Sequence, residues 1–130
     1  MIVLDSGVVT AFATADRLLR ERIVRLSRRS GEPFLVPATV IIEATTASPA
    51  RDANVNRFLR ACDIVVLDDP LARRAAALRF ASRRGSPIDA SVVATAEARG
   101  GGVVLTSDLD DLRALAEHAN GVEVLGIVDG

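Results

Sequence analysis

Lysine, tryptophan and tyrosine are absent from this 130-residue sequence, and cysteine occurs once. A lone cysteine, Cys62, cannot form a disulfide within the chain or a cysteine-based zinc cluster, and it suits the reducing cytoplasm. Four scattered phenylalanines offer no aromatic platform on which nucleic-acid bases could stack. Any nucleic acid that this protein contacts is therefore expected to be recognised through the charge and shape of its backbone.

Long apolar runs are also missing. No apolar stretch approaches the roughly 20 residues that span a bilayer, and the N-terminal MIVLDSG has no basic region followed by an apolar run. We therefore expect a soluble, unexported, cytoplasmic protein without a membrane partner. With 49% hydrophobic and 25% charged residues, 9 Gly and 5 Pro, the composition predicts one globular domain over residues 1–130.

Arginine alone carries the positive charge: all 16 basic residues are Arg, and the net charge is −1. This net charge gives no argument for nucleic-acid binding, and a GC-rich genome would produce the same preference for Arg, Ala and Val. Arginine is nevertheless the side chain best shaped to bind phosphate. Two Arg clusters, at residues 17–29 and 73–84, fall in or beside predicted helices. Most members are expected on solvated faces, and a minority could follow a phosphate backbone.

Five short apolar runs alternate with helical patterns along the chain. The runs are mostly continuous and β-branched, which is typical of strands buried on both faces of a parallel sheet. The predicted fold class is α/β, a single domain with a mostly parallel sheet of about five strands and helices on both faces. Strands are predicted at residues 1–4, 34–36, 63–67, 102–106 and 122–128, and helices at 16–29, 38–47, 52–60, 70–83, 87–99 and 109–119.

Four acidic residues are predicted to converge at one edge of this sheet. In open α/β sheets, ligands bind beyond the carboxyl ends of the strands. Asp5 follows the first run, Glu43 follows the second by one helical turn, Asp108 follows the fourth, and Asp89 lies near a helix start. Four carboxylates in a small pocket repel one another unless they are protonated or share a cation. Their oxygens suit Mg²⁺ or Mn²⁺, as in metal-dependent phosphodiester hydrolysis.

Asp5 and Asp89 also have local structural explanations. Asp89 lies three residues after Ser86 with Pro87 between them, the pattern of a capping box. Asp5 could close the first strand in a turn. Sequence spacing leaves the capping and the metal-binding interpretations open.

Asp108, in TSDLDDL, has two capping alternatives. It could be a helix N-cap with Asp111 three positions later, or Ser107 could be the cap with Asp110 as its partner. Spacing does not separate these alternatives from a role as ligand.

Glu43 has the weakest structural explanation. It lies in VIIEATT, and no basic residue occurs between Arg29 and Arg51. A carboxylate that loses water without a partner is costly or becomes neutral. Glu43 is therefore the acid that most needs a partner from elsewhere in the fold.

The ordered segments MIVLDSG, VPATVIIEATTA, PIDASVVATA and VVLTSDLDDL resemble the PIN-domain nucleases over essentially the whole chain, and within them the VapC-type toxins of toxin–antitoxin pairs. The resemblance implies a PIN-like domain in which three or four acids gather around Mg²⁺ or Mn²⁺, and an endoribonuclease that hydrolyses RNA. Matched motif by motif, Asp5, Glu43, Asp89 and Asp108 would be its catalytic and metal-binding residues. It also implies a homodimer and a small cognate antitoxin that blocks the site.

Three further positions follow from the resemblance. Asp111 falls on an additional acidic position, and Thr106 occupies the polar position before the fourth acid, where it is expected to bond to the acid cluster. Members of the family commonly carry Ser or Thr two residues after the first acid, whereas this chain has Gly7 there and a hydroxyl at Ser6. Either Ser6 substitutes for that hydroxyl or the site is weaker.

Other functional classes share parts of this pattern. Phosphoacceptor receiver domains and haloacid-dehalogenase-type phosphatases also place acids at strand ends, but both rely on a lysine, which this chain lacks. An inactive PIN-like domain serving as a binding or scaffold module would share the whole pattern. Gly7 favours that alternative and the four acids oppose it. A nuclease acting on DNA would differ only in its substrate.

Overall fold

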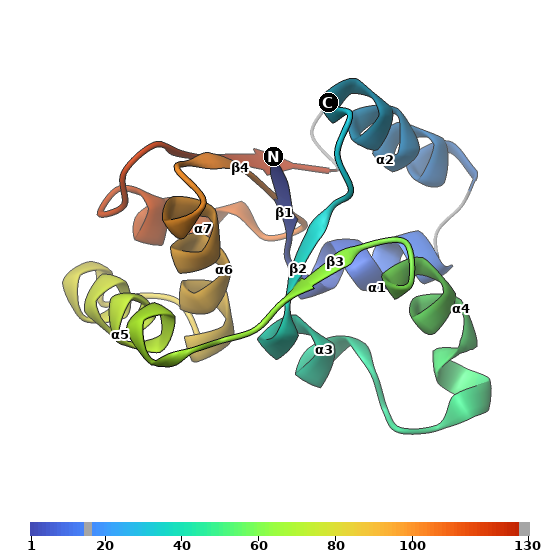
Figure 1. Ribbon diagram of the computed structural model, residues 1–130, viewed down its shortest axis with the longest axis horizontal. Helices are drawn as coiled ribbons and strands as arrows, with labels where there is room; N and C mark the ends of the chain where they lie inside the picture. The colour runs from blue at the N-terminus through green and yellow to red at the C-terminus, as the bar shows by residue number, and fades with distance from the viewer. Residues whose placement is uncertain (15–16, 128–130) are drawn as a thin grey trace.

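The computed structural model describes residues 1–14 and 17–127, which form a parallel sheet with helices on both faces (Figure 1). The strands are β1 (Ile2–Leu4), β2 (Leu35–Pro37), β3 (Asp63–Val65), β4 (Gly102–Thr106) and β5 (Val122–Gly126). All neighbouring strands are parallel, and their order in the sheet is β3-β2-β1-β4-β5. The predicted α/β class and the position of each predicted strand are confirmed.

The helices alternate with these strands along the chain. They are α1 (Ser6–Thr14), α2 (Arg17–Ser30), α3 (Ala38–Ala44), α4 (Pro49–Leu59), α5 (Asp69–Ser82), α6 (Pro87–Ala98) and α7 (Leu109–Ala116). The chain crosses the sheet from β1 to β3 and then returns to β4 beside β1. Because parallel crossovers are right-handed, this reversal places the two halves on opposite faces. Figure 1 shows α1, α2 and α4 on one side of the strands and α5, α6 and α7 on the other.

Sequence reasoning missed one helix, α1. Each of the six helices that it did predict is present. The segment SGVVTAFAT contains adjacent β-branched residues, which have low helix propensity. Val8 and Val9 are both fully buried, so tertiary packing outweighs their local preference. Residue 16 of the predicted helix at 16–29, and residue 128 of the predicted strand at 122–128, lie outside the described residues.

The boundary between α3 and α4 also differs from the prediction: α3 ends at Ala44 and α4 begins at Pro49. The buried Asp52 accepts hydrogen bonds from the backbone N–H of Thr46 at 2.9 Å and from its hydroxyl at 2.9 Å. These bonds, the backbone bond first, lower the pKa of Asp52 below its ordinary value. The carboxylate thus closes the loop between the two helices, and residues 45–47 of that loop had been predicted to belong to the first helix.

The core centres on β1, which ends directly before Asp5, and on α6, which contains Asp89. Val3 and Leu4 are fully buried, and α6 is buried from Ala90 to Ala96. The many Ala and Val side chains of α6 let this helix pack closely against β1, β2, β4 and β5. Within the described residues, no helix combines the length and apolarity needed to cross a membrane.

Candidate active site

Asp5 lies immediately after β1 and is the most deeply buried of the predicted site acids. Its side chain is 5% exposed, and its backbone N–H donates to the Leu105 carbonyl of β4 at 3.1 Å. No ion pair reaches Asp5 within residues 1–14 and 17–127. A buried carboxylate without a basic partner is costly unless hydrogen bonds or a cation stabilise it.

Hydrogen bonds from both sides orient the Asp5 carboxylate. Thr106 Oγ1 donates to Asp5 Oδ2 at 2.7 Å, and the Ser6 N–H donates to Asp5 Oδ1 at 2.6 Å. Thr106 is itself fully buried at the end of β4. Its Oγ1 also accepts from the Asp108 N–H at 2.9 Å. One hydroxyl therefore fixes the carboxylate that follows β1 relative to the turn that follows β4.

Glu43 is connected to Asp5 through Ser6. The Ser6 hydroxyl donates to Glu43 Oε1 at 2.9 Å and lies 3.4 Å from Asp5 Oδ1. Glu43 is exposed on α3, and none of the ion pairs among the described residues includes it. The partner of Glu43 is thus a hydroxyl beside a second acid, and no arginine in the described part of the chain forms an ion pair with it.

Asp89 has both the capping role and the proximity to other acids that the sequence left open. Ser86 Oγ accepts from the Asp89 N–H at 3.0 Å, and Asp89 Oδ2 accepts from the Ser86 N–H at 3.0 Å. Burial raises the pKa of Asp89, and the negative charges of Asp5 and Asp111 raise that pKa further, while the Ser86 bonds oppose the shift. A nearby cation would therefore stabilise the ionised form of Asp89.

Asp108 and Asp111 occupy the start of α7. Asp108 is at the N-cap position, but its side chain makes no capping hydrogen bond. Asp111 binds Arg84, whose Nη2 and Nε lie 3.0 Å and 3.1 Å from Asp111 Oδ1. Sequence reasoning placed Arg84 only in a basic cluster. Its pairing with an acid across the fold had no signal in the sequence.

The four predicted acids fit a divalent cation by their chemistry. Their present arrangement is a separate matter: among residues 1–14 and 17–127, no group of three or more Asp, Glu, His or Cys side chains is placed closely enough to hold a metal ion. The oxygen-only donors, the absence of ion pairs to these acids within that range and the raised pKa of Asp89 match a hard cation. Glu43 and Asp108 are exposed, so their rotamers can change without repacking the core.

Gly7 lies in the first turn of α1, directly against Ser107. A Cβ atom on Gly7 would lie 2.0 Å from Ser107 Oγ and 3.1 Å from Ser107 Cβ. Gly7 is not among the residues with positive φ, so the close approach of the Ser107 side chain, and not backbone conformation, favours glycine here. The Ser107 hydroxyl occupies the position that a side chain at residue 7 would need. Sequence reasoning missed this contact because it joins distant segments.

Comparison with known proteins agrees with this architecture. The sequence profile described as PIN domain matches residues 2–118. No curated protein sequence matches the chain significantly.

Several solved structures share its fold. DNA-bound VapBC from Salmonella typhimurium has a TM-score of 0.71 and 19% identity, with 97% of each chain covered. VapBC2 from Rickettsia felis, bound to a promoter DNA fragment, has a TM-score of 0.74 and 12% identity over 97% of this chain and 98% of that one. A toxin-antitoxin complex from Klebsiella pneumoniae has a TM-score of 0.67 and 17% identity over 94% and 95%. At these identities the similarity shows the fold.

Proposed function

The chain belongs to the PIN-domain family, and from this premise we propose that it is a Mg²⁺- or Mn²⁺-dependent endoribonuclease, the toxin of a toxin–antitoxin pair. PIN domains are generally nucleases. The observation that carries the proposal is Asp5, a buried carboxylate without an ion pair in the described residues. It shares Ser6 with Glu43 and raises the pKa of Asp89.

Asp5, Glu43, Asp89 and Asp108 would hold the metal. When bound, such an ion activates water for attack on the phosphodiester and neutralises charge on the scissile phosphate. Thr106 and the Ser6 N–H keep both oxygens of Asp5 oriented, and this preorganisation removes the need to order the carboxylate during the reaction. The Ser6 hydroxyl holds Glu43 toward Asp5.

The basic cluster at the end of α5 borders these acids. Arg84 binds Asp111, and Asp111 is close enough to Asp89 to raise its pKa. Arg79, Arg83 and Arg84 line one shallow pocket together. In the proposed function these guanidinium groups guide the RNA backbone toward the acids without reading sequence.

The toxin assignment comes from the neighbours of this fold. One structure with this fold is described as a toxin-antitoxin complex, and extending that role to this chain is part of the proposal. The cognate antitoxin would be a small protein encoded beside the toxin. An adjacent reading frame for a small DNA-binding protein would support the assignment, and expression of the chain alone without any effect on growth would contradict it.

The proposed toxin is a homodimer, the state that the resemblance to VapC-type toxins implies, and its exposed apolar side chains are where the interface is sought. Ile42 on α3, Val66 after β3 and Phe80 on α5 are 72%, 74% and 82% exposed. We expect Phe80→Glu to convert a dimer into a monomer in sedimentation velocity. Leu18→Glu makes the same kind of change on α2, at an apolar residue that is 74% exposed, and would place the interface on α2 if it, and not Phe80→Glu, gave a monomer. A monomeric parent protein would contradict the dimer.

Cleavage of a labelled RNA oligonucleotide tests the nuclease function. We expect cleavage with Mg²⁺ or Mn²⁺, none with EDTA, and none of a single-stranded DNA of the same sequence. Cleavage of the DNA alone would replace RNA by DNA as the substrate. An inactive scaffold is the alternative, favoured by the lack of a ready three-residue metal group in the described residues. Calorimetry separates the two, because such a scaffold would bind neither metal tightly.

A further inference from the structure

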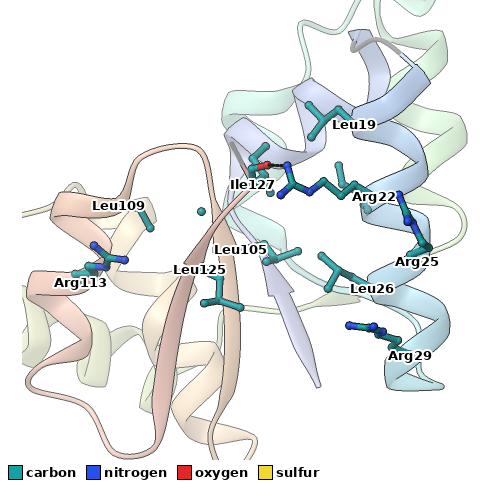
Figure 2. Close-up of a pocket in the computed structure, with 12 residues that line it drawn as sticks. Leu19, Arg22, Arg25, Leu26, Arg29, Leu105, Leu109, Arg113, Leu125 and Ile127 are labelled. Carbon is teal, nitrogen blue, oxygen red and sulfur yellow. Dashed lines mark hydrogen bonds between the residues drawn. The ribbon is translucent and has the colours of Figure 1, made fainter. Parts of the chain in front are cut away.

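The acids of the candidate site are held in place by different parts of the fold. Asp5 follows β1, and its N–H donates to the Leu105 carbonyl of β4. Leu105 is buried and lines a groove together with Leu26 of α2 (Figure 2), so the sheet and its cover fix this side of the site. Glu43 lies on α3, a helix of 7 residues whose N-cap residue makes no side-chain hydrogen bond. The position of Glu43 therefore depends on what attaches α3 to the rest of the fold.

Two polar side chains, Thr39 and Glu43, occur on α3. They are four residues apart and therefore lie on the same face of the helix. Thr39 Oγ1 is 2.6 Å from Ser91 Oγ of α6, and Glu43 Oε1 accepts from the Ser6 hydroxyl at the start of α1. Hydroxyl groups thus attach α3 to α6 at its first turn and to α1 near its end.

The hydrogen bond between Thr39 and Ser91 has a definite direction. Ser91 is 1% exposed, and its hydroxyl lies 2.6 Å from the Ile88 carbonyl, one turn earlier in α6. A carbonyl oxygen can only accept and a hydroxyl has one proton, so Ser91 donates to Ile88 and accepts from Thr39. The Ser91 hydroxyl is already satisfied within its own helix, and the bond from Thr39 serves to join the two helices.

This joint connects two acids of the candidate site. Asp89 lies in the first turn of α6, where the capping box with Ser86 holds it, so the placement of α3 against α6 sets the placement of Glu43 relative to Asp89. We propose that Thr39 and Ser91 are positioning residues, whose hydrogen bond keeps Glu43 and Asp89 in place for a shared cation. The cation rests on the proposed function, whereas the attachment of α3 to α6 does not.

Thr39→Val tests the attachment, because it removes the hydroxyl and keeps the shape of the side chain. Ser91 stays bonded to Ile88 in this variant, so thermal unfolding should change little. The backbone amides of residues 42–44 should exchange with deuterium about tenfold faster, since local opening of α3 becomes easier. The amides of α6 should keep the rate of the parent protein.

Two variants serve as controls for this exchange measurement. Thr39→Ser retains the hydroxyl and should restore the parent rate. Thr45→Val makes the same chemical change at another half-buried threonine, whose hydroxyl donates to the Ile41 carbonyl of α3. Because that bond does not reach α6, residues 42–44 should exchange as in the parent protein.

Metal affinity and kinetics test the positioning role. Thr39→Val should weaken Mn²⁺ binding in calorimetry by about tenfold, as is typical when a residue that orients a ligand is lost. It should lower kcat for RNA and leave KM unchanged, because the arginines that contact the backbone are untouched. Ser91→Ala should act in the same way, and the double variant should be no worse than either single one, since both remove one bond. Thr39→Ser should retain both metal affinity and kcat.

Different results would overturn different parts of the proposal. Unchanged exchange of residues 42–44 in Thr39→Val would refute the attachment. Faster exchange with the metal affinity and kcat of the parent would leave Thr39 and Ser91 a structural pair and refute the positioning role. A parent protein that neither binds metal nor cleaves RNA would contradict the proposed function and with it the shared cation, and the exchange measurement would still decide the attachment of α3.

Discussion

The substitution Asp5→Asn is expected to lower metal-dependent RNA cleavage by about 10²-fold or more, because it removes the charge of the buried carboxylate at the site. The fold should survive. Asn keeps an oxygen that accepts from the Ser6 N–H. In the parent protein Thr106 Oγ1 donates to Asp5, and in the variant the hydrogen bond can reverse, with the Asn amide donating to a lone pair of Thr106 Oγ1. The measurements are kcat/KM on a labelled RNA and thermal unfolding followed by circular dichroism.

Matched variants make this expectation specific. Glu43→Gln should also reduce cleavage strongly, because it removes the second charge that Ser6 connects to Asp5. Asp63→Asn makes the same chemical change at an exposed acid that begins β3, at the opposite edge of the sheet, and should leave cleavage unchanged. Full activity of Asp5→Asn and Glu43→Gln with Mg²⁺ present would refute the site assignment.

The sheet could be predicted because its strands are buried on both faces. Runs such as IVL at β1 and GVVLT at β4 are continuous and β-branched, and Val3, Leu4 and Val104 are indeed fully buried. This pattern needs no knowledge of distant contacts. The same logic located Asp5 and Asp108 at the carboxyl ends of strands, where a parallel sheet brings them to one edge.

Contacts between distant segments could not be predicted in this way. Glu43 is bound by the Ser6 hydroxyl, and Asp111 is bound by Arg84, yet in each pair the residues belong to different elements. The helix α1 was missed because the local preference of its valines opposes the state that burial imposes. Periodicity reports how one element faces the core, and it carries no information on which side chains meet across the site.

Gly7→Ala is the sharpest test of one such distant contact, and we expect its effect on stability to change sign with the residue at position 107. In the parent protein the new Cβ would meet Ser107 Oγ at 2.0 Å and Ser107 Cβ at 3.1 Å. Relieving this overlap requires the exposed Ser107 side chain to rotate and its Cβ to move by a few tenths of an ångström, which should lower the free energy of unfolding by about 0.5–1.5 kcal/mol. Cleavage should fall as well, because Ser107 lies between Thr106 and Asp108.

In a Ser107→Gly background the overlap is absent. The helical backbone at Gly7 suits alanine, and replacing glycine at a compatible position stabilises a protein by about 0.4–1 kcal/mol. Gly7→Ala should therefore raise stability there, and the double-mutant cycle should give a coupling energy of about 1–3 kcal/mol, as expected for residues in contact. Urea unfolding of the four proteins measures it. Additive effects would mean that Ser107 does not restrict residue 7, and that another contact explains the glycine.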